Sequence, residues 1–162
     1  MADKEAAFAL ALLGGAMDTE RQAAALMRCN ETAGSGGLTL TRQQALALAE
    51  TRRQALEKTG RIELGGGIQP LLVEAFRDSP YLTKDSFAPA LHELTELFYA
   101  CKNETGDRVS DRALIAWMRQ AFNGACRGST ELLGSRAMDE LARRVRAGTA
   151  PRAFGEAART DD

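Results

Sequence analysis

The sequence predicts an all-α fold: a single-domain helical bundle of six or seven helices, with at most one short β-ribbon. Two observations predict this class. Apolar residues recur at helical spacing in successive segments, whereas the alternation typical of a strand is confined to residues 61–64. Residues that begin or end helices recur at intervals that suit helices of moderate length.

Length and composition suit one globular domain. The chain has 162 residues, of which 44% are hydrophobic and 27% are charged, as in ordinary folded domains. A polar stretch that contains proline and glycine follows Gly148. We therefore expect a helical domain over residues 1–148 and a flexible C-terminal tail over residues 149–162.

Glycine delimits the first two predicted helices. The first covers residues 3–13 and stops at Gly14-Gly15, and the second begins with Asp18 as its N-cap. The glycine- and serine-rich residues 33–37 end the second helix.

The middle of the chain has the clearest boundary signals. Thr41 and Gln44 match a capping box, in which each side chain accepts a hydrogen bond from the other residue's backbone N–H, at the start of a helix over residues 42–58. Gly60 is placed to end this helix in the left-handed conformation. Pro70 fits the first turn of the next helix.

A further helix is bounded by proline and polar residues. Ser79-Pro80 ends the helix before it, because the residue preceding proline disfavours helix. The new helix begins near Ser86, since Pro89 is tolerated only in a first turn, and residues 103–106 end it.

Serine marks the remaining helix starts. Ser110 or Asp111 caps a helix that carries a broad apolar face. Ser129 and Ser135 resemble caps on either side of Gly134, so we expect the last helical stretch, which reaches about residue 147, to be broken.

Most aromatic residues lie in one part of the chain, between positions 76 and 122, which predicts the centre of the core. We expect Trp117 to be substantially buried. The residues concerned are Phe76, Tyr81, Phe87, Phe98, Tyr99, Trp117 and Phe122.

Charge and cysteine content limit the possible partners and location. The formal net charge of -1 provides no positive field for nucleic acid or an anionic membrane surface, so neither is an expected partner. The three cysteines are widely spaced, which predicts reduced, buried thiols without disulfides or a zinc site. The first five residues include two acidic side chains and one basic one, unlike a secretion signal, so we expect a cytoplasmic protein. The sequence does not indicate an oligomeric state.

Several blocks of sequence carry a family resemblance. They include Arg28-Cys29-Asn30-Glu31, Thr59-Gly60-Arg61-Ile62-Glu63, Gly65-Gly66-Gly67-Ile68, Asp78-Ser79-Pro80-Tyr81 and Lys102-Asn103-Glu104. Over roughly residues 26–145 they resemble an uncharacterised bacterial family, known only as a domain of unknown function. The resemblance implies a complete bacterial protein of helical character and no particular activity.

One helix pairs histidine with glutamate in a way that invites a metal interpretation. His92 and Glu96 are four residues apart and could face one cation. On a helical wheel, however, these two residues and Tyr99 lie opposite the apolar arc, which predicts a solvated face. A zinc peptidase motif needs a second histidine, and the chain has only one. We therefore expect no metal and no cofactor.

Three consecutive glycines form the preferred candidate for a ligand site. Gly65, Gly66 and Gly67 can present backbone N–H groups to an anion, with Arg61 and Glu63 on one side. A tight structural bend would use the same glycines.

A second candidate residue for this site is Arg52, which falls within the apolar arc of its helix and should be covered. It then needs a carboxylate or carbonyl partner, which Glu31, Glu63 or Glu104 could supply. Residues 124–129 have a weak likeness to a phosphate loop but lack its lysine.

No catalytic residue is predicted, because no nucleophile is linked to a base by its spacing. The sequence therefore favours a non-enzymatic interaction or regulatory module that binds a protein partner or a small anion. The alternative is an anion-binding protein or an enzyme with a charged pocket near the triple glycine, formed by Arg52, Arg61, Glu63 and neighbouring carboxylates.

Overall fold

The computed structural model describes residue 6, residues 17–34 and residues 36–149, and within these ranges the protein contains helices and no strand. A helix over residues 17–28, here called the front helix, leads into the short helix η1 (Cys29–Thr32). The elements that follow are α2 (Arg42–Thr59), α3 (Gln69–Phe76), α4 (Phe87–Glu104), α5 (Asp111–Asn123), α6 (Thr130–Leu132), the π-helix η2 (Leu133–Ala137) and α7 (Met138–Arg146). The prediction of an all-α bundle is confirmed.

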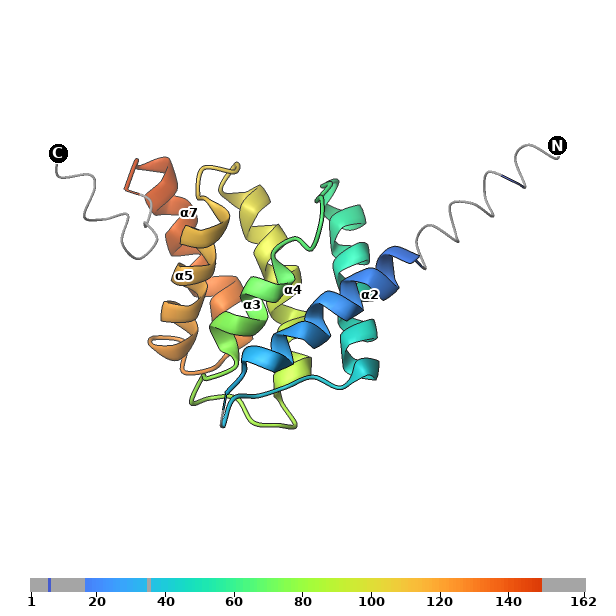
Figure 1. The fold of residues 1–162 in the computed structure, drawn as a ribbon. Coiled ribbons are helices and arrows are strands. Elements are labelled where there is room, and N and C mark those ends of the chain that lie inside the picture. The colour runs from blue at the N-terminus through green and yellow to red at the C-terminus, as the bar shows by residue number, and fades with distance from the viewer. Residues whose placement is uncertain (1–5, 7–16, 35, 150–162) are drawn as a thin grey trace, which may run out of the picture.

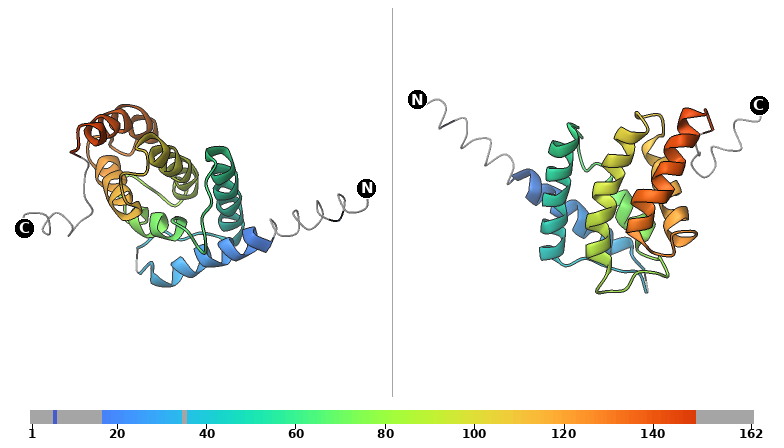
Figure 2. Two further views of the ribbon diagram at one scale, coloured as in Figure 1. Left: turned by 90° about the horizontal axis from the view of Figure 1, so that it is seen from above. Right: turned by 180° about the vertical axis from the view of Figure 1, so that it is seen from behind.

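Helix α4 occupies the centre of the bundle. It packs against α2 on one side and against α3 and α6 on others, while η2 joins α6 to α7 and contacts α5. Seen from above, α2 lies on one side of α4 and α5 and α7 on the other, with the front helix running along one face (Figures 1 and 2). None of the helices in the described part of the chain is long and apolar enough to cross a membrane.

The predicted helix boundaries in the middle of the chain are confirmed. Thr41 and Gln44 form the capping box, and Gly60 ends α2 with φ = 69°. Pro70 lies in the first turn of α3, and Ser110 accepts a hydrogen bond from the N–H of Ala113 at the start of α5. Each of these signals is local, so tertiary packing does not have to be known to interpret it.

Two predicted caps are wrong. Asp18 already lies within the front helix. Ser129 does cap α6, but Ser135 lies inside η2, where its hydroxyl donates to the C=O of Glu131. The predicted break near Gly134 is thus a π-helical segment and not a new helix start. Apart from residue 6, which is helical, the helix predicted over residues 3–13 lies outside the described residues, as does nearly all of the predicted tail.

The core forms largely where the aromatic residues cluster. The rings of Phe76 and Phe122 meet edge to face with centroids 5.3 Å apart, and those of Phe98 and Tyr99 do so at 5.2 Å. Phe87 is also buried. The prediction was too broad in two cases, because Tyr81 is 44% exposed and Trp117 is half-buried against the core.

The solvated face predicted for α4 is wrong in part. Glu96 is exposed, but His92 is half-buried and Tyr99 is fully buried. Because α4 is central, α2 covers the side that the helical wheel assigned to solvent.

Candidate functional site

The loop between α2 and α3 is anchored by Arg52 of α2. We call residues 61–67 the glycine loop. The Arg52 side chain is 3% exposed, and its Nε donates to Glu63 Oε1 at 2.8 Å. Its Nη2 lies 3.4 Å from the carbonyl oxygens of Glu63 and Gly65, and its Nη1 lies 3.8 Å from Asp18 Oδ2 of the front helix. The prediction that Arg52 is covered and paired is confirmed, with Glu63 as the partner.

Tyr99 also holds the Glu63 carboxylate, and Gly67 leaves room for it. The Tyr99 hydroxyl donates to Glu63 Oε1 at 2.6 Å. Gly67 has φ = 64°, and a Cβ atom there would lie 1.9 Å from the same oxygen. Burial acts to lower the pKa of Arg52, but the hydrogen bond and charge of Glu63 raise it above its usual range. Burial, and then the neighbouring carboxylate, raise the pKa of Tyr99. The guanidinium therefore stays charged and the phenol neutral.

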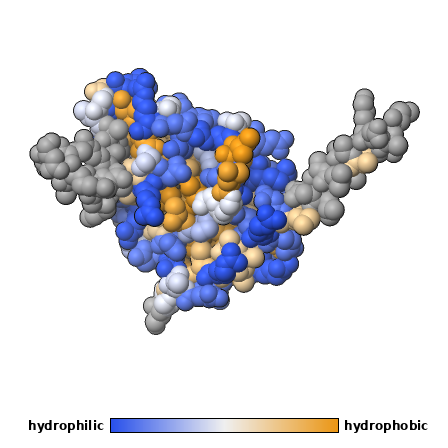
Figure 3. Space-filling model, turned by 45° about the horizontal axis from the view of Figure 1, so that its top comes forward, coloured by the Kyte–Doolittle hydropathy of each residue, from blue (hydrophilic) through white to orange (hydrophobic). Residues whose placement is uncertain are grey.

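Residues 61–64 do alternate between inward and outward side chains, but the charged residue points inward and the apolar residues point outward. No strand forms there; Glu63 points inward, whereas Ile62 is 93% exposed and Leu64 is 89% exposed. Hydrophobic surface accordingly protrudes where α2 leads into α3 (Figure 3). The glycine loop thus presents two aliphatic side chains to solvent from an anchored backbone.

Arg61 lies apart from the glycines that the sequence placed beside it. Its guanidinium donates to Asn103 Oδ1 at 2.5 Å and forms an ion pair with Asp107, at the end of α4. The hydrogen bond from Arg61 holds the pKa of Asp107 below its usual range. Arg61 therefore ties the start of the loop to α4.

A pocket of about 350 Å³ lies between the glycine loop and the front helix. One wall consists of side chains on one face of the front helix, and the other consists of loop backbone with the side chains of Glu63 and Leu64. The lining residues are Asp18, Arg21, Gln22, Ala25 and Arg28 from the helix and Glu63, Leu64, Gly65 and Gly66 from the loop. The structure thus brings Glu63, Gly65 and Gly66 together at one pocket, with Arg52 behind Glu63.

The front-helix residues were missed by the sequence analysis. Positions 18, 21, 22, 25 and 28 follow the spacing of one helical face, and all of them except Ala25 are polar or charged. A polar stripe of this length was a detectable signal. The segment that packs opposite this stripe could not be predicted from the sequence, because the glycine loop begins more than thirty positions after the front helix ends.

A buried chain of amides leads to Gln22, which lines the pocket. Gln69 Nε2 donates to the C=O of Leu48 at 2.8 Å and to Thr95 Oγ1 at 3.2 Å. Because a carbonyl oxygen can only accept, this contact orients the Gln69 amide. Its Oε1 then accepts from Gln22 Nε2 at 2.9 Å. The Gln22 amide is oriented in turn, and its Oε1 is left as an acceptor.

The histidine contacts a hydroxyl group of α2. His92 Nδ1 lies 2.5 Å from Thr51 Oγ1 of α2. Burial lowers the pKa of His92, against an opposing effect of Glu96. Among the described residues there is no group of three potential metal-binding side chains of the histidine, cysteine or acidic types.

The three cysteines and the turn at Gly128 are packed against neighbouring side chains. Cys29, Cys101 and Cys126 are free and buried, as predicted. Burial raises the pKa of Cys101 to about 12, which keeps its thiol protonated. Gly128 has φ = 80°, and a Cβ atom there would lie 2.5 Å from Cβ of Tyr81, so close packing requires glycine in this helix-to-helix turn.

A family model described as "Family of unknown function (DUF6323)" matches residues 25–151, which is most of the chain. The chain belongs to this family. The DUF6323 match includes the glycine loop, Arg28 and helices α2 to α7, whereas Asp18, Arg21 and Gln22 precede it. Neither the curated proteins nor the solved structures contain a match to the chain.

Proposed function

We propose that this protein is a non-enzymatic interaction module that docks onto a protein partner through the glycine loop, with Ile62 and Leu64 as the anchoring side chains. The observation that carries the proposal is their exposure, 93% and 89%, on a loop whose intervening residue is held in place. Scattered exposed apolar residues are ordinary, but two on one side of a short anchored segment form a patch.

The anchoring favours binding because it reduces the entropy lost on docking. Arg52 and Tyr99 hold Glu63, and Asn103 and Asp107 hold Arg61. The two exposed side chains therefore project from a loop whose conformation is already set. Preorganisation of this kind raises affinity without adding contacts.

The proposal specifies a partner with an apolar cleft. Burying an exposed isoleucine or leucine contributes about 1.5–3 kcal/mol, so the pair can supply the centre of a small interface.

We also propose a cytoplasmic location, which the three free, buried cysteines support.

Site-specific photo-crosslinking tests the docking role. A photo-reactive amino acid in place of Ile62 should yield one discrete protein adduct in cells, and the same substitution at Leu132, which is 39% exposed on α6, should not. The adduct partner is then purified, and its affinity is measured for the Ile62→Ser/Leu64→Ser variant and for Leu132→Ser. We expect the loop variant to bind at least tenfold more weakly with unchanged helical content. Equal adducts at both positions, or unchanged affinity of the loop variant, would contradict the proposal.

A further inference from the structure

The pocket beside the glycine loop carries a second inference, which does not depend on the docking role. We propose that it binds a small dicarboxylate that also carries a hydroxyl or amino group. The argument rests on the cationic side chains, the loop amides and the acceptor groups that line the pocket.

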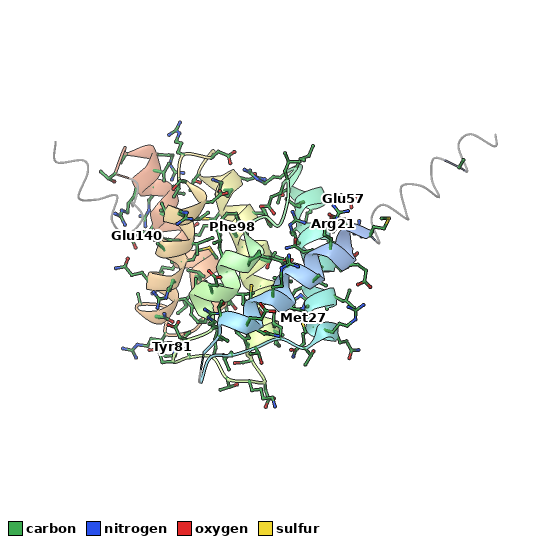
Figure 4. The ribbon with its side chains drawn as sticks, viewed as in Figure 1. Arg21, Met27, Glu57, Tyr81, Phe98 and Glu140 are labelled. Atoms are coloured by element: carbon green, nitrogen blue, oxygen red, sulfur yellow. The ribbon has the colours of Figure 1, made fainter. Side chains whose placement is uncertain are left out.

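Arg21 and Arg28 supply the positive charge. Both line the pocket, and neither forms an ion pair or hydrogen bond with another described residue. They are seven positions apart, which places them two turns apart on one face of the front helix, about 10 Å along its axis. Figure 4 labels Arg21 on this helix. Two separated guanidinium groups on long side chains match two carboxylates better than one.

The loop backbone adds N–H donors. Arg52 attracts the carbonyl oxygens of Glu63 and Gly65. In a trans peptide the C=O of one residue and the N–H of the next point in opposite directions, so the N–H groups of Leu64 and Gly66 point away from Arg52. Neither N–H donates to any group in the described residues, and both residues line the pocket. The buried arginine thus turns two amides toward a place where an oxyanion can accept.

The acceptors in the pocket favour a ligand that carries a hydrogen-bond donor. Gln22 is 3% exposed, and the amide chain from Leu48 leaves its Oε1 without a donor among the described residues. No side-chain oxygen in that part of the protein is both fully buried and unpartnered, so this atom reaches solvent, and the pocket is the surface that Gln22 lines. Asp18 contributes a carboxylate that is 53% exposed at the same wall. A hydroxyl or ammonium group on the ligand would satisfy these acceptors.

The charges around the pocket favour an anionic ligand. Glu63 is already committed to Arg52 and Tyr99, and Asp18 is the other acidic lining residue. Asp18 also lies 3.8 Å from Arg52, so three guanidinium groups face two carboxylates and the pocket keeps a net positive charge. The volume of about 350 Å³ admits a small metabolite.

Isothermal titration calorimetry with matched probes tests the inference. The probes are L-malate, L-aspartate, succinate and inorganic phosphate at millimolar concentrations. Malate and succinate differ only by the hydroxyl, so malate or aspartate should bind at least tenfold more tightly than succinate. Arg21→Gln and Arg28→Gln should each weaken binding about tenfold or more. Arg119→Gln is the matched control, since Arg119 is an exposed arginine on α5 that pairs with Asp78.

Several results would overturn the inference. They are no heat with any probe, equal affinity for malate and succinate, binding of phosphate alone, or equal weakening by the Arg119 control. Circular dichroism of each variant separates weakened binding from loss of the fold. Ile62→Ser removes a docking side chain outside the pocket, so it should leave malate binding unchanged even if docking fails.

Discussion

Two glycines of the same loop should respond differently to alanine. Gly65 and Gly67 have almost the same backbone conformation, with φ values of 66° and 64°. A Cβ atom at Gly65 meets nothing within 4 Å, whereas one at Gly67 would lie 1.9 Å from Glu63 Oε1 and 3.1 Å from Arg52 Nε. Gly65→Ala therefore introduces backbone strain alone, and Gly67→Ala also displaces the carboxylate.

The size of the difference follows from the hydrogen bonds that the Glu63 carboxylate accepts. The left-handed conformation costs a non-glycine residue about 1–2 kcal/mol in either variant. The reduced entropy of the unfolded chain is also common to both variants and cancels. Moving Glu63 breaks its bonds to Arg52 at 2.8 Å and Tyr99 at 2.6 Å. Each hydrogen bond to a charged group contributes about 1.5–3 kcal/mol, so Gly67→Ala should cost at least about that much more than Gly65→Ala.

Urea unfolding measures the two free energies directly. The decisive control is Glu63→Ala, because without the carboxylate the two glycine positions should become nearly equivalent. Equal losses for Gly65→Ala and Gly67→Ala in the parent protein would refute the reasoning. So would a difference that persists in the Glu63→Ala background.

Three other outcomes are expected. Arg52→Met should cost about 3–5 kcal/mol in urea unfolding because it strands a partly buried carboxylate, whereas Arg53→Met, at an exposed pair on the same helix, should cost less than about 1 kcal/mol. Because burial lowers the pKa of His92 in the folded protein, this histidine is protonated at a higher pH in the unfolded state than in the folded state. Stability should therefore drop below a pH of about 6.5 and level off below the folded pKa, and His92→Gln should remove this dependence in pH-resolved unfolding. Trp117→Ala should cost less than Phe122→Ala, for which about 3–5 kcal/mol is expected, because Trp117 is half-buried and Phe122 is fully buried; equal losses in thermal unfolding would contradict this.

Part of the candidate site could be predicted from the sequence. The burial of Arg52 followed from its place in the apolar arc of α2, and Glu63 was among the carboxylates considered as its partner. The position of Arg61 could not be predicted, because its partners Asn103 and Asp107 lie more than forty positions away. The same holds for Tyr99, whose hydroxyl meets a loop far from it in sequence.

The sequence by itself determined the features that depend on neighbouring residues. The capping box at Thr41, the left-handed end at Gly60 and the first-turn proline at Pro70 are each decided within one helical turn, and the structure contains all three. The all-α class follows from such local signals and from apolar periodicity.

The tertiary structure alone decided which faces are covered. Helix α4 has neighbours on several sides, so Tyr99 is buried although a wheel with one apolar arc assigns it to solvent. Residues 61–64 alternate, but Arg52 draws Glu63 inward and leaves Ile62 and Leu64 exposed. A period in the sequence specifies which residues share a face, whereas the partner that covers that face comes from distant segments through packing and charge pairing.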